Sequence, residues 1–357
     1  MTALPDLNDS QLMDICTLFL KGAGPVQTQK ACNKLWKDQG LAVKISREQV
    51  NRAVQLAVSR GYLRLAPPYE EHLAQRFEDR FQHPRERIHI ASVRKSLDHV
   101  VSAAVDVVLG LIDEHAEKNR DDPEKDGRVH LGLGAGRTNM LFAQLLAQAL
   151  REKRRKPLPP LAFHALTSGF DAGAPEKAPD AFFGYFQNIQ PDLRMIGLFG
   201  PPLVKASEFK KARQRQITRD SFDQRDKIDI VVTALASYTD PHGDLKRLVE
   251  LASVGSKEMD VRAVVGDVQY CPFDAEKPVK IRSGLRAMTL FEIDELVERV
   301  AAQSMDVVLV SGPCRVCDES RYKALTPLVK SPKLKMWSHI VTDLTTAEKV
   351  LDPPPEA

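Results

Sequence analysis

Glycines and hydrogen-bond donors are concentrated in the segment 132–139, which reads Gly-Leu-Gly-Ala-Gly-Arg-Thr-Asn and stands between an apolar run and a helical pattern. In a parallel α/β sheet this position is the carboxyl end of a strand, where ligands bind. Glycine lets backbone N–H groups approach an anion, and the start of a helix favours negative charge. The segment therefore predicts a phosphate or other anion site, with a tight strand–helix turn that needs glycine as the alternative. The candidate contacts are Gly134, Gly136, Arg137, Thr138 and Asn139.

A lone carboxylate, Asp267, directly follows the apolar run 262–266, which we expect to be another strand. At the carboxyl end of a parallel strand it would accept hydrogen bonds from sugar hydroxyls. The alternative is an aspartate that caps its own turn, and the pattern does not choose between the two.

Cys314 and Cys317 are separated by two residues, a spacing that suits thiol redox chemistry or half of a zinc site. The sequence holds no second such pair, although Cys271 would approach this one if both loops line one cleft. Two thiols without a clear partner set are more often structural. We therefore expect no metal and no cofactor, and keep a thiol- or metal-responsive protein as an alternative.

A third set of polar residues lies on the helix expected after Ser46. Arginine reads guanine, and asparagine or glutamine reads adenine, in the major groove of DNA. Between residues 41 and 68 the chain carries five Lys and Arg against one Glu, which is the charge expected of a phosphate-contacting surface. An ordinary surface helix is the alternative. The candidate DNA contacts are Ser46, Arg47, Gln49, Asn51, Arg52 and Gln55.

The elements around this helix resemble a small DNA-binding domain. Apolar spacing predicts one helix before Gly22 and a second over 28–38, and Ser46 with Gln49 forms a capping box for the third. A short alternating run over 62–65 then predicts a wing strand. We expect a winged helix-turn-helix over 1–68, followed by a linker with a connecting helix over 69–91.

The remainder of the chain alternates short apolar runs with helical patterns, for example 129–133 before 140–150 and 305–310 after 290–302. Such alternation predicts an α/β domain with a largely parallel sheet covered on both faces. We place this larger domain at 92–352 and expect the proline-rich tail 353–357 to be disordered.

Composition sets outer limits on the class of protein. The 357 residues are 43% hydrophobic and 28% charged, as in globular proteins with sizeable cores. No apolar run approaches the ~18 residues of a membrane span, and the N-terminus lacks a signal pattern. Five cysteines in so long a chain do not form a disulfide framework. We therefore expect a cytoplasmic protein that does not bind membranes.

Two distant segments, 45–65 and 340–351, resemble the recognition helix with its wing and the closing strand and helix of the SorC/DeoR-type sugar-operon regulators. Between them the glycine turn ending Gly136-Arg-Thr138, the run 200–204 and the turn 265–267 fall in the family's order. The resemblance therefore covers nearly the whole chain.

The resemblance implies a winged-helix DNA reader joined to an effector domain related to sugar-phosphate isomerases and CoA transferases. It further implies a homo-oligomer, dimer or tetramer, that binds a double-stranded DNA operator and responds to a sugar-phosphate effector. Phosphate would lie on the glycine turn, and Asp267 would face the sugar. Gly169 and Lys323 complete the candidate effector contacts. Here 167–169 lacks the arginine that some members use for a second phosphate, which disfavours a bisphosphate.

These observations predict a regulator rather than an enzyme, with no catalytic residue. The rival from another class is a sugar-phosphate isomerase or deaminase that uses Asp267 as a base. The basic helical N-terminal segment favours the regulator, since a metabolic isomerase has no need of it.

Overall fold

The computed structural model describes residues 4–59, 62, 67–152, 158–169, 173–243, 263–281 and 284–355. The chain divides into two compact units, Met1–Ala66 and Pro67–Ala357, and each is described here by itself.

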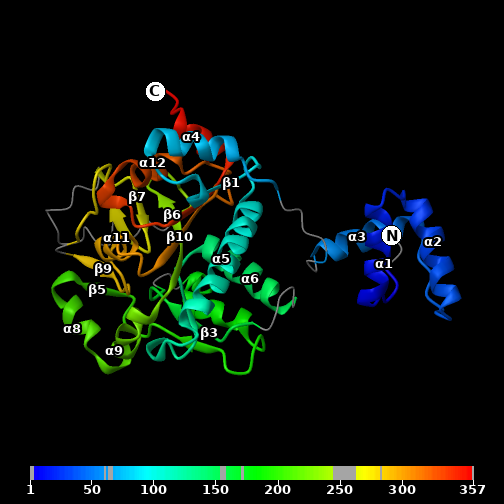
Figure 1. Ribbon diagram of the computed structural model, residues 1–357, viewed down its shortest axis with the longest axis horizontal. Helices are drawn as coiled ribbons and strands as arrows, with labels where there is room; N and C mark the ends of the chain where they lie inside the picture. Colours follow the sequence, from blue (N-terminus) through cyan, green and yellow to red (C-terminus); the bar gives the residue numbers. More distant parts are fainter. Residues whose placement is uncertain are drawn as a thin grey trace. The chain divides into compact units, whose positions relative to one another are not determined.

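The smaller unit consists of three helices around one apolar core (Figure 1). They are α1 (Asp9–Leu20), α2 (Pro25–Asp38) and α3 (Arg47–Ser59). Trp36 is fully buried, and its indole N–H donates to Asp14 Oδ2 at 2.9 Å, which ties α2 to α1. The wing strand predicted over 62–65 falls almost entirely outside the described residues.

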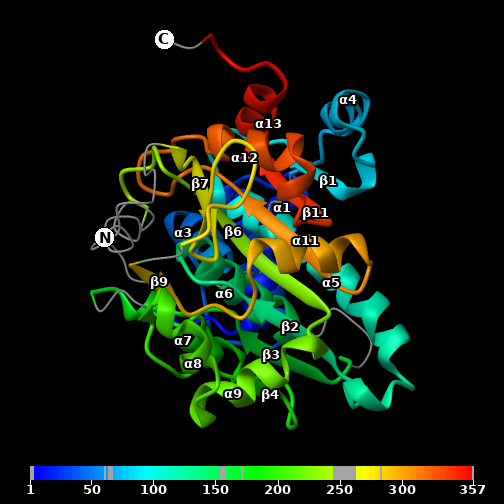
Figure 2. The ribbon, with the colours of Figure 1, turned by 90° about the vertical axis from the view of Figure 1, so that its left-hand side faces the viewer.

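Among the described residues of the larger unit, seven strands form a parallel sheet in the order β1-β11-β10-β6-β2-β3-β4 (Figure 2). Their bounds are β1 (Ile88–Ala91), β2 (Val129–Leu133), β3 (Leu161–Ala165), β4 (Arg194–Ile196), β6 (Ile230–Ser237), β10 (Asp306–Ser311) and β11 (His339–Asp343). An antiparallel hairpin of β7 (Gly266–Val268) and β8 (Cys271–Phe273) extends from the end of β6. β5 (Leu203–Lys205) and β9 (Leu285–Ala287) form a separate antiparallel pair.

Helices cover both faces of this sheet. They are α4 (Glu71–Phe81), α5 (Leu97–Asn119), α6 (Arg137–Arg151), α7 (Pro179–Phe182), α8 (Phe209–Arg213), α9 (Gln216–Asp223), α11 (Ile293–Ala301), α12 (Tyr322–Lys330) and α13 (Leu344–Leu351). Alternate residues along each strand point to opposite faces, so Val231 and Leu309 pack on one side while Val232 and Val308 pack on the other. The first core lies under α4, α11, α12 and α13, and the second under α5 and α6.

The predicted α/β class with a large parallel sheet is confirmed, with differences in detail. The run 262–266, expected as a parallel strand, is not one in its described part, because Gly266 begins β7 and pairs antiparallel with β6. The stretch 69–91, which we expected to connect two domains, packs into the larger unit: Phe77 of α4 and Ile90 of β1 are buried in its core.

The long helix α5 is a core element. The helix buries an apolar face against the sheet and α6, so this face is not available to a second chain. The buried residues of that face include Val100, Val101, Ala104, Val105, Val108 and Ile112.

Several histidines are buried in the larger unit. His89 and His339 stack on neighbouring strands β1 and β11, with ring centroids 5.6 Å apart. Burial lowers the pKa of each to about 4. His164 on β3 is fully buried beside His130, and burial lowers its pKa to about 3. These rings therefore stay neutral in the folded protein well below the pKa of a free histidine.

Acidification should destabilise the larger unit through these histidines. Below about pH 6.5 these histidines are protonated in the unfolded chain but stay neutral in the folded chain. Stability is therefore lost as pH falls from about 6.5 toward about 4. Each ring contributes up to ~2 kcal/mol of this loss at about pH 5. Urea unfolding at about pH 7 and about pH 5 measures it. His89→Gln should reduce the pH dependence, whereas His72→Gln, at an exposed position of α4, should not. An equal free energy of unfolding at the two pH values contradicts the account.

Candidate functional site

A cavity opens at the carboxyl ends of the parallel strands, where the strand order reverses. From β2 the chain proceeds to β3 and β4 on one side, whereas from β6 it proceeds to β10 and β11 on the other. Ligands of open α/β sheets bind in the crevice left at such a point. The cavity holds about 760 Å³ of empty space, including its part open to solvent.

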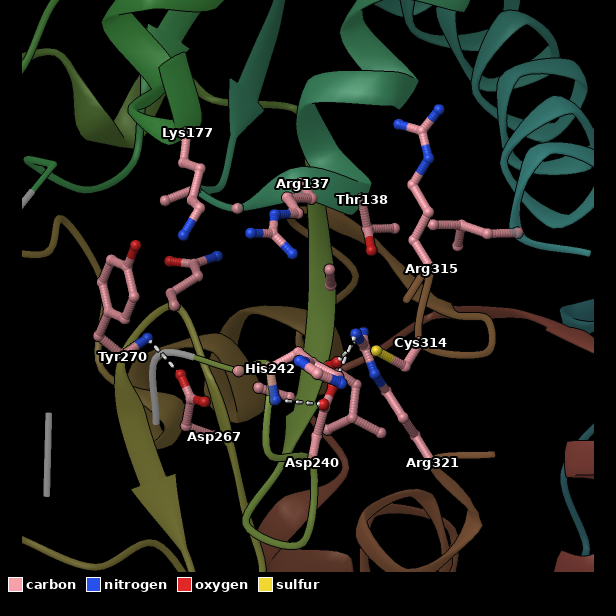
Figure 3. Close-up of a pocket in the computed structure, with 18 residues that line it drawn as sticks. Arg137, Thr138, Lys177, Asp240, His242, Asp267, Tyr270, Cys314, Arg315 and Arg321 are labelled. Carbon is pink, nitrogen blue, oxygen red and sulfur yellow. Dashed lines mark hydrogen bonds and ion pairs between the residues drawn. The ribbon is translucent and has the colours of Figure 1, made fainter. Parts of the chain in front are cut away.

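The glycine turn forms one wall of this cavity (Figure 3). Gly136 is the N-cap of α6, with φ 101° and ψ 168°, a conformation that is essentially restricted to glycine. Its N–H donates to the Lys177 carbonyl at 2.9 Å, and the N–H of Gly134 donates to the Val232 carbonyl at 3.0 Å. Both glycine N–H groups, which we expected to hold phosphate, are therefore already used. The N–H groups without intrahelical partners are those of the first helical residues, 137–139.

The side chains at this helix start have different positions. Thr138 is buried and its hydroxyl points into the cavity, whereas Arg137 is exposed at the rim (Figure 3). Asn139 is buried and does not line the cavity; its Nδ2 donates to the Ala135 carbonyl at 2.8 Å. Asn139 thus holds the shape of the turn with its side chain, while its backbone N–H belongs to the first turn of α6.

Lys177 faces this helix start from the segment before α7. Its backbone carbonyl accepts from Gly136, its side chain is only 7% exposed, and the ammonium group points into the cavity (Figure 3). A buried ammonium beside a helix N-terminus is an anion-binding combination, because both contribute positive potential. Lys177 is not among the candidate contacts predicted from the sequence.

Opposite the glycine turn lies a buried ion pair at the end of β6. Nη2 of Arg321 is 3.4 Å from Asp240 Oδ2, and Nη1 of Arg321 donates to the Leu235 carbonyl at 2.6 Å. The second oxygen of Asp240 accepts the backbone N–H of His242 at 2.9 Å. The Nε of Arg321 is buried with no hydrogen-bond partner among the described residues. The pair is therefore held in a fixed position and retains one unused donor.

The hairpin of β7 and β8 supplies the third wall. Asp267 is buried, and its carboxylate accepts the backbone N–H of Tyr270 at 2.8 Å across a turn in which Gln269 and Tyr270 both have positive φ. Gln269 is 6% exposed, and within the described part of the chain neither its amide nitrogen nor its amide oxygen has a partner. A buried amide without partners at a cavity wall is the expected state of a group that a polar ligand completes.

Two candidate effector contacts lie elsewhere. Gly169 lines an adjacent hollow, and a Cβ on it would lie 2.5 Å from Ala178 Cβ, so glycine is needed there for packing. Lys323 is exposed on α12 and does not line the cavity; the cation at the wall is Arg321, two residues earlier. This corrects the expectation for Lys323. Other polar lining residues absent from the candidates are Lys177, Asp240, His242, Gln269, Tyr270 and Arg315.

The cysteines are also separated by the fold. Cys314 is buried and lines the cavity, while Cys317 is exposed. Cys271 lies in β8, where its sulfur is 3.8 Å from the Phe291 carbonyl oxygen, and burial raises its pKa. Cys271 does not line this cavity, so it does not share one cleft with Cys314 and Cys317.

On α3 of the smaller unit, the candidate DNA contacts differ in exposure. Arg47, Asn51 and Gln55 are exposed on one side of the helix. The expected capping box is present: Gln49 N–H donates to Ser46 Oγ at 3.4 Å and Ser46 N–H donates to Gln49 Oε1 at 2.8 Å. The amide oxygen of Gln49 is thus committed to the cap, which weakens its case as a base contact.

A side-chain clamp fixes the entry to α3. The amide of Asn33 on α2 accepts from Ile45 N–H at 2.8 Å and donates to the Ile45 carbonyl at 2.9 Å. This pair of bonds holds the residue before Ser46 against α2. The direction in which α3 leaves the turn is therefore set by α2.

Comparison with known proteins identifies the fold. No family model matches the sequence, and no curated protein does. The sorbitol operon regulator SorC from Klebsiella pneumoniae superposes with a TM-score of 0.55 at 15% identity, covering 97% of this chain and 100% of that one. A transcriptional regulator from Streptococcus pneumoniae gives 0.56 at 14% identity, over 79% of this chain and 96% of that one. A DeoR family regulator from Listeria monocytogenes gives 0.50 at 16%, over 78% and 98%.

The fold is that of the SorC/DeoR-type regulators. The predicted resemblance is confirmed at the level of fold, and the SorC match spans both compact units. At these low identities the comparison shows the fold alone and does not identify a ligand.

Replacing Gly136 by alanine should lower the free energy of unfolding by about 1–3 kcal/mol, because only glycine adopts its backbone conformation without strain. A Cβ there would meet nothing within 4 Å, so the loss reports strain and not a clash. Gly110 in α5 is the matched control, since a Cβ there also meets nothing within 4 Å. Gly110→Ala should stabilise the protein by about 0.5–1 kcal/mol. Urea unfolding measures both, and equal effects would contradict the strain.

Proposed function

We propose that this protein is a cytoplasmic DNA-binding transcriptional regulator whose larger unit binds a small phosphorylated sugar. The observation that carries the proposal is the cavity at the reversal of strand order, where a helix start, a buried lysine and polar groups with no partner among the described residues converge. The resemblance in fold to regulators, including one of a sorbitol operon, supports it. No catalytic role is assigned to the cavity residues.

The phosphate would lie at the start of α6. The Thr138 hydroxyl and the Lys177 ammonium face the same space. The first turn of α6 also has three N–H groups without intrahelical partners. Charge-assisted bonds of this kind are about twice as strong as neutral ones, and the helix dipole adds to them. Arg137 at the rim contributes a further cation.

The sugar would extend toward the other two walls. Carboxylates accept hydrogen bonds from hydroxyl groups, and Asp240 and Asp267 both line the cavity. The amide of Gln269 has a donor nitrogen and an acceptor oxygen, and neither has a partner among the described residues. One ligand hydroxyl group would satisfy these two atoms only in part. A ligand with several hydroxyl groups at one end and a phosphate at the other matches this distribution of donors and acceptors.

DNA would be read by α3. Its exposed Arg47, Asn51 and Gln55 are residue types that pair with base edges in the major groove. A single helix contacts only a short half-site, so useful specificity needs two or more smaller units at fixed spacing. We therefore propose a homo-oligomer, dimer or tetramer, in the functional complex.

The DNA contact is tested by substitution on α3. Arg47→Ala and Asn51→Ala should each weaken binding to a cognate operator by ~1–3 kcal/mol and relax specificity at one base pair. Arg76→Ala removes a cation from α4 of the larger unit and should leave binding unchanged. Fluorescence anisotropy at several salt concentrations measures affinity, with the operator first selected from random duplexes. Wild-type affinity and salt dependence in both α3 variants would show that this helix is not the reader.

The effector contact is tested by a thermal-shift screen of aldose and ketose phosphates on the full chain, since ligand binding raises the apparent melting temperature. Lys177→Met should weaken the binding of the best ligand by about 10- to 100-fold, the equivalent of one charge-assisted bond. Lys323→Met is the matched control and should bind normally. If Lys177→Met keeps its melting temperature without ligand and also keeps full affinity, the phosphate does not lie at this wall.

A further inference from the structure

Three potential metal ligands converge at one edge of the cavity. One carboxylate oxygen of Asp240 and the sulfurs of Cys314 and Cys317 all lie within 4.8 Å of one another. Around a tetrahedral zinc ion with bonds of about 2.3 Å to sulfur, two sulfurs are ~3.8 Å apart. Small rotations of the side chains are therefore enough to bring all three atoms to a single ion.

The turn that carries the two cysteines is closed by backbone hydrogen bonds. Cys314 N–H donates to the Glu319 carbonyl, and Asp318 N–H donates to the Cys314 carbonyl, each at 2.9 Å, so the turn is closed on itself. Cys314, at the start of this turn, is buried, and Cys317, at its end, is exposed. The thiolate is the form of cysteine that binds metal.

The carboxylate is oriented in the same way. Asp240 is 5% exposed and is held on both oxygens, by Arg321 on one and by the N–H of His242 on the other. Ligating carboxylates characteristically have such outer partners, which fix their direction. Each oxygen keeps a lone pair for a metal.

Charge also balances at this place. Two thiolates and one carboxylate carry three negative charges, a zinc ion carries two positive charges, and the adjacent Arg321 supplies one more. The guanidinium therefore offsets the excess negative charge of the occupied site. Sulfur ligands select zinc over hard cations such as magnesium or calcium.

We propose that Asp240, Cys314 and Cys317 bind one zinc ion at the edge of the cavity, with an open fourth position. Because Asp240 and Cys314 line the cavity, that position faces the space assigned to the ligand. Three protein ligands and one exchangeable position are the arrangement of zinc sites that contact small molecules. If the proposed function holds, an oxygen of the sugar occupies this position, and zinc strengthens effector binding.

The test is metal binding by the full chain, with neither DNA nor sugar present. Protein freed of metal by a chelator and kept reduced by a phosphine is titrated with zinc in competition with a chromophoric chelator, and separately with cobalt. One zinc ion per chain should bind, and the cobalt protein should absorb as a tetrahedral complex with two thiolates.

Cys317→Ser is the decisive variant, because Cys317 is exposed and its loss should leave the core intact. It should lower zinc affinity by about tenfold or more and reduce the cobalt–thiolate absorption by about half. Asp240→Asn should lower affinity and keep that absorption. Cys271→Ser is the matched control, a buried cysteine outside the cluster, and should bind zinc normally.

Failure of zinc to bind stoichiometrically to the reduced wild-type protein would overturn the site, and so would equal affinity in Cys317→Ser. Formation of a Cys314–Cys317 disulfide on removal of the reductant, with no zinc bound beforehand, would assign the pair to thiol chemistry instead. None of these results depends on the effector or DNA experiments, so the two proposals fail independently.

Discussion

The reversal of strand order between β2 and β6 is the constraint on which the rest of the larger unit depends. Crossover connections from these two neighbouring strands run in opposite directions, which leaves a crevice between their carboxyl ends. Three of the candidate groups reach this crevice from the ends of different strands: Thr138 after β2, Asp240 after β6 and Cys314 after β10. The two apolar cores on either face of the sheet hold these strands in register.

Burial gives the polar groups of the crevice their character. Asp240 and Arg321 are largely removed from solvent, and a buried charge is tolerated only when it is paired and hydrogen-bonded. The side-chain amide of Gln269 and the Nε of Arg321 have no partners among the described residues, so their burial is unfavourable. Hydrogen bonds from a polar ligand would offset this desolvation free energy. The same low solvent access strengthens each contact to an anion at the start of α6. Ligand binding would change the affinity for DNA only if it favours one arrangement of the smaller units over another.

The sequence predicted the parts of this architecture that are encoded locally. A buried run, a glycine turn and an amphipathic helix are contiguous in 129–151, so the start of α6 could be found from spacing alone. Lys177 and Gln269 could not, because Lys177 lies in an irregular segment after β3 and Gln269 in the turn of a hairpin, and no periodicity encodes where either segment packs. Lys323 was chosen from the family resemblance, yet it is exposed on α12, whereas Arg321, the N-cap of that helix, lines the cavity. Asp267 lines the cavity from an antiparallel hairpin and not from a parallel strand end, which the apolar run before it could not reveal.

The central claim is that an anion binds at the crevice of the strand-order reversal, at the start of α6. The most direct measurement is a crystal structure of the full chain with the sugar phosphate that most raises its melting temperature. The account predicts that the phosphorus lies within hydrogen-bonding range of the N–H groups of residues 137–139 and of the Lys177 ammonium. The larger hollow at the opposite end of the strands, lined by Arg87, Lys335 and His339 among others, is the competing location. A phosphate bound there, or anywhere away from α6, would contradict the account.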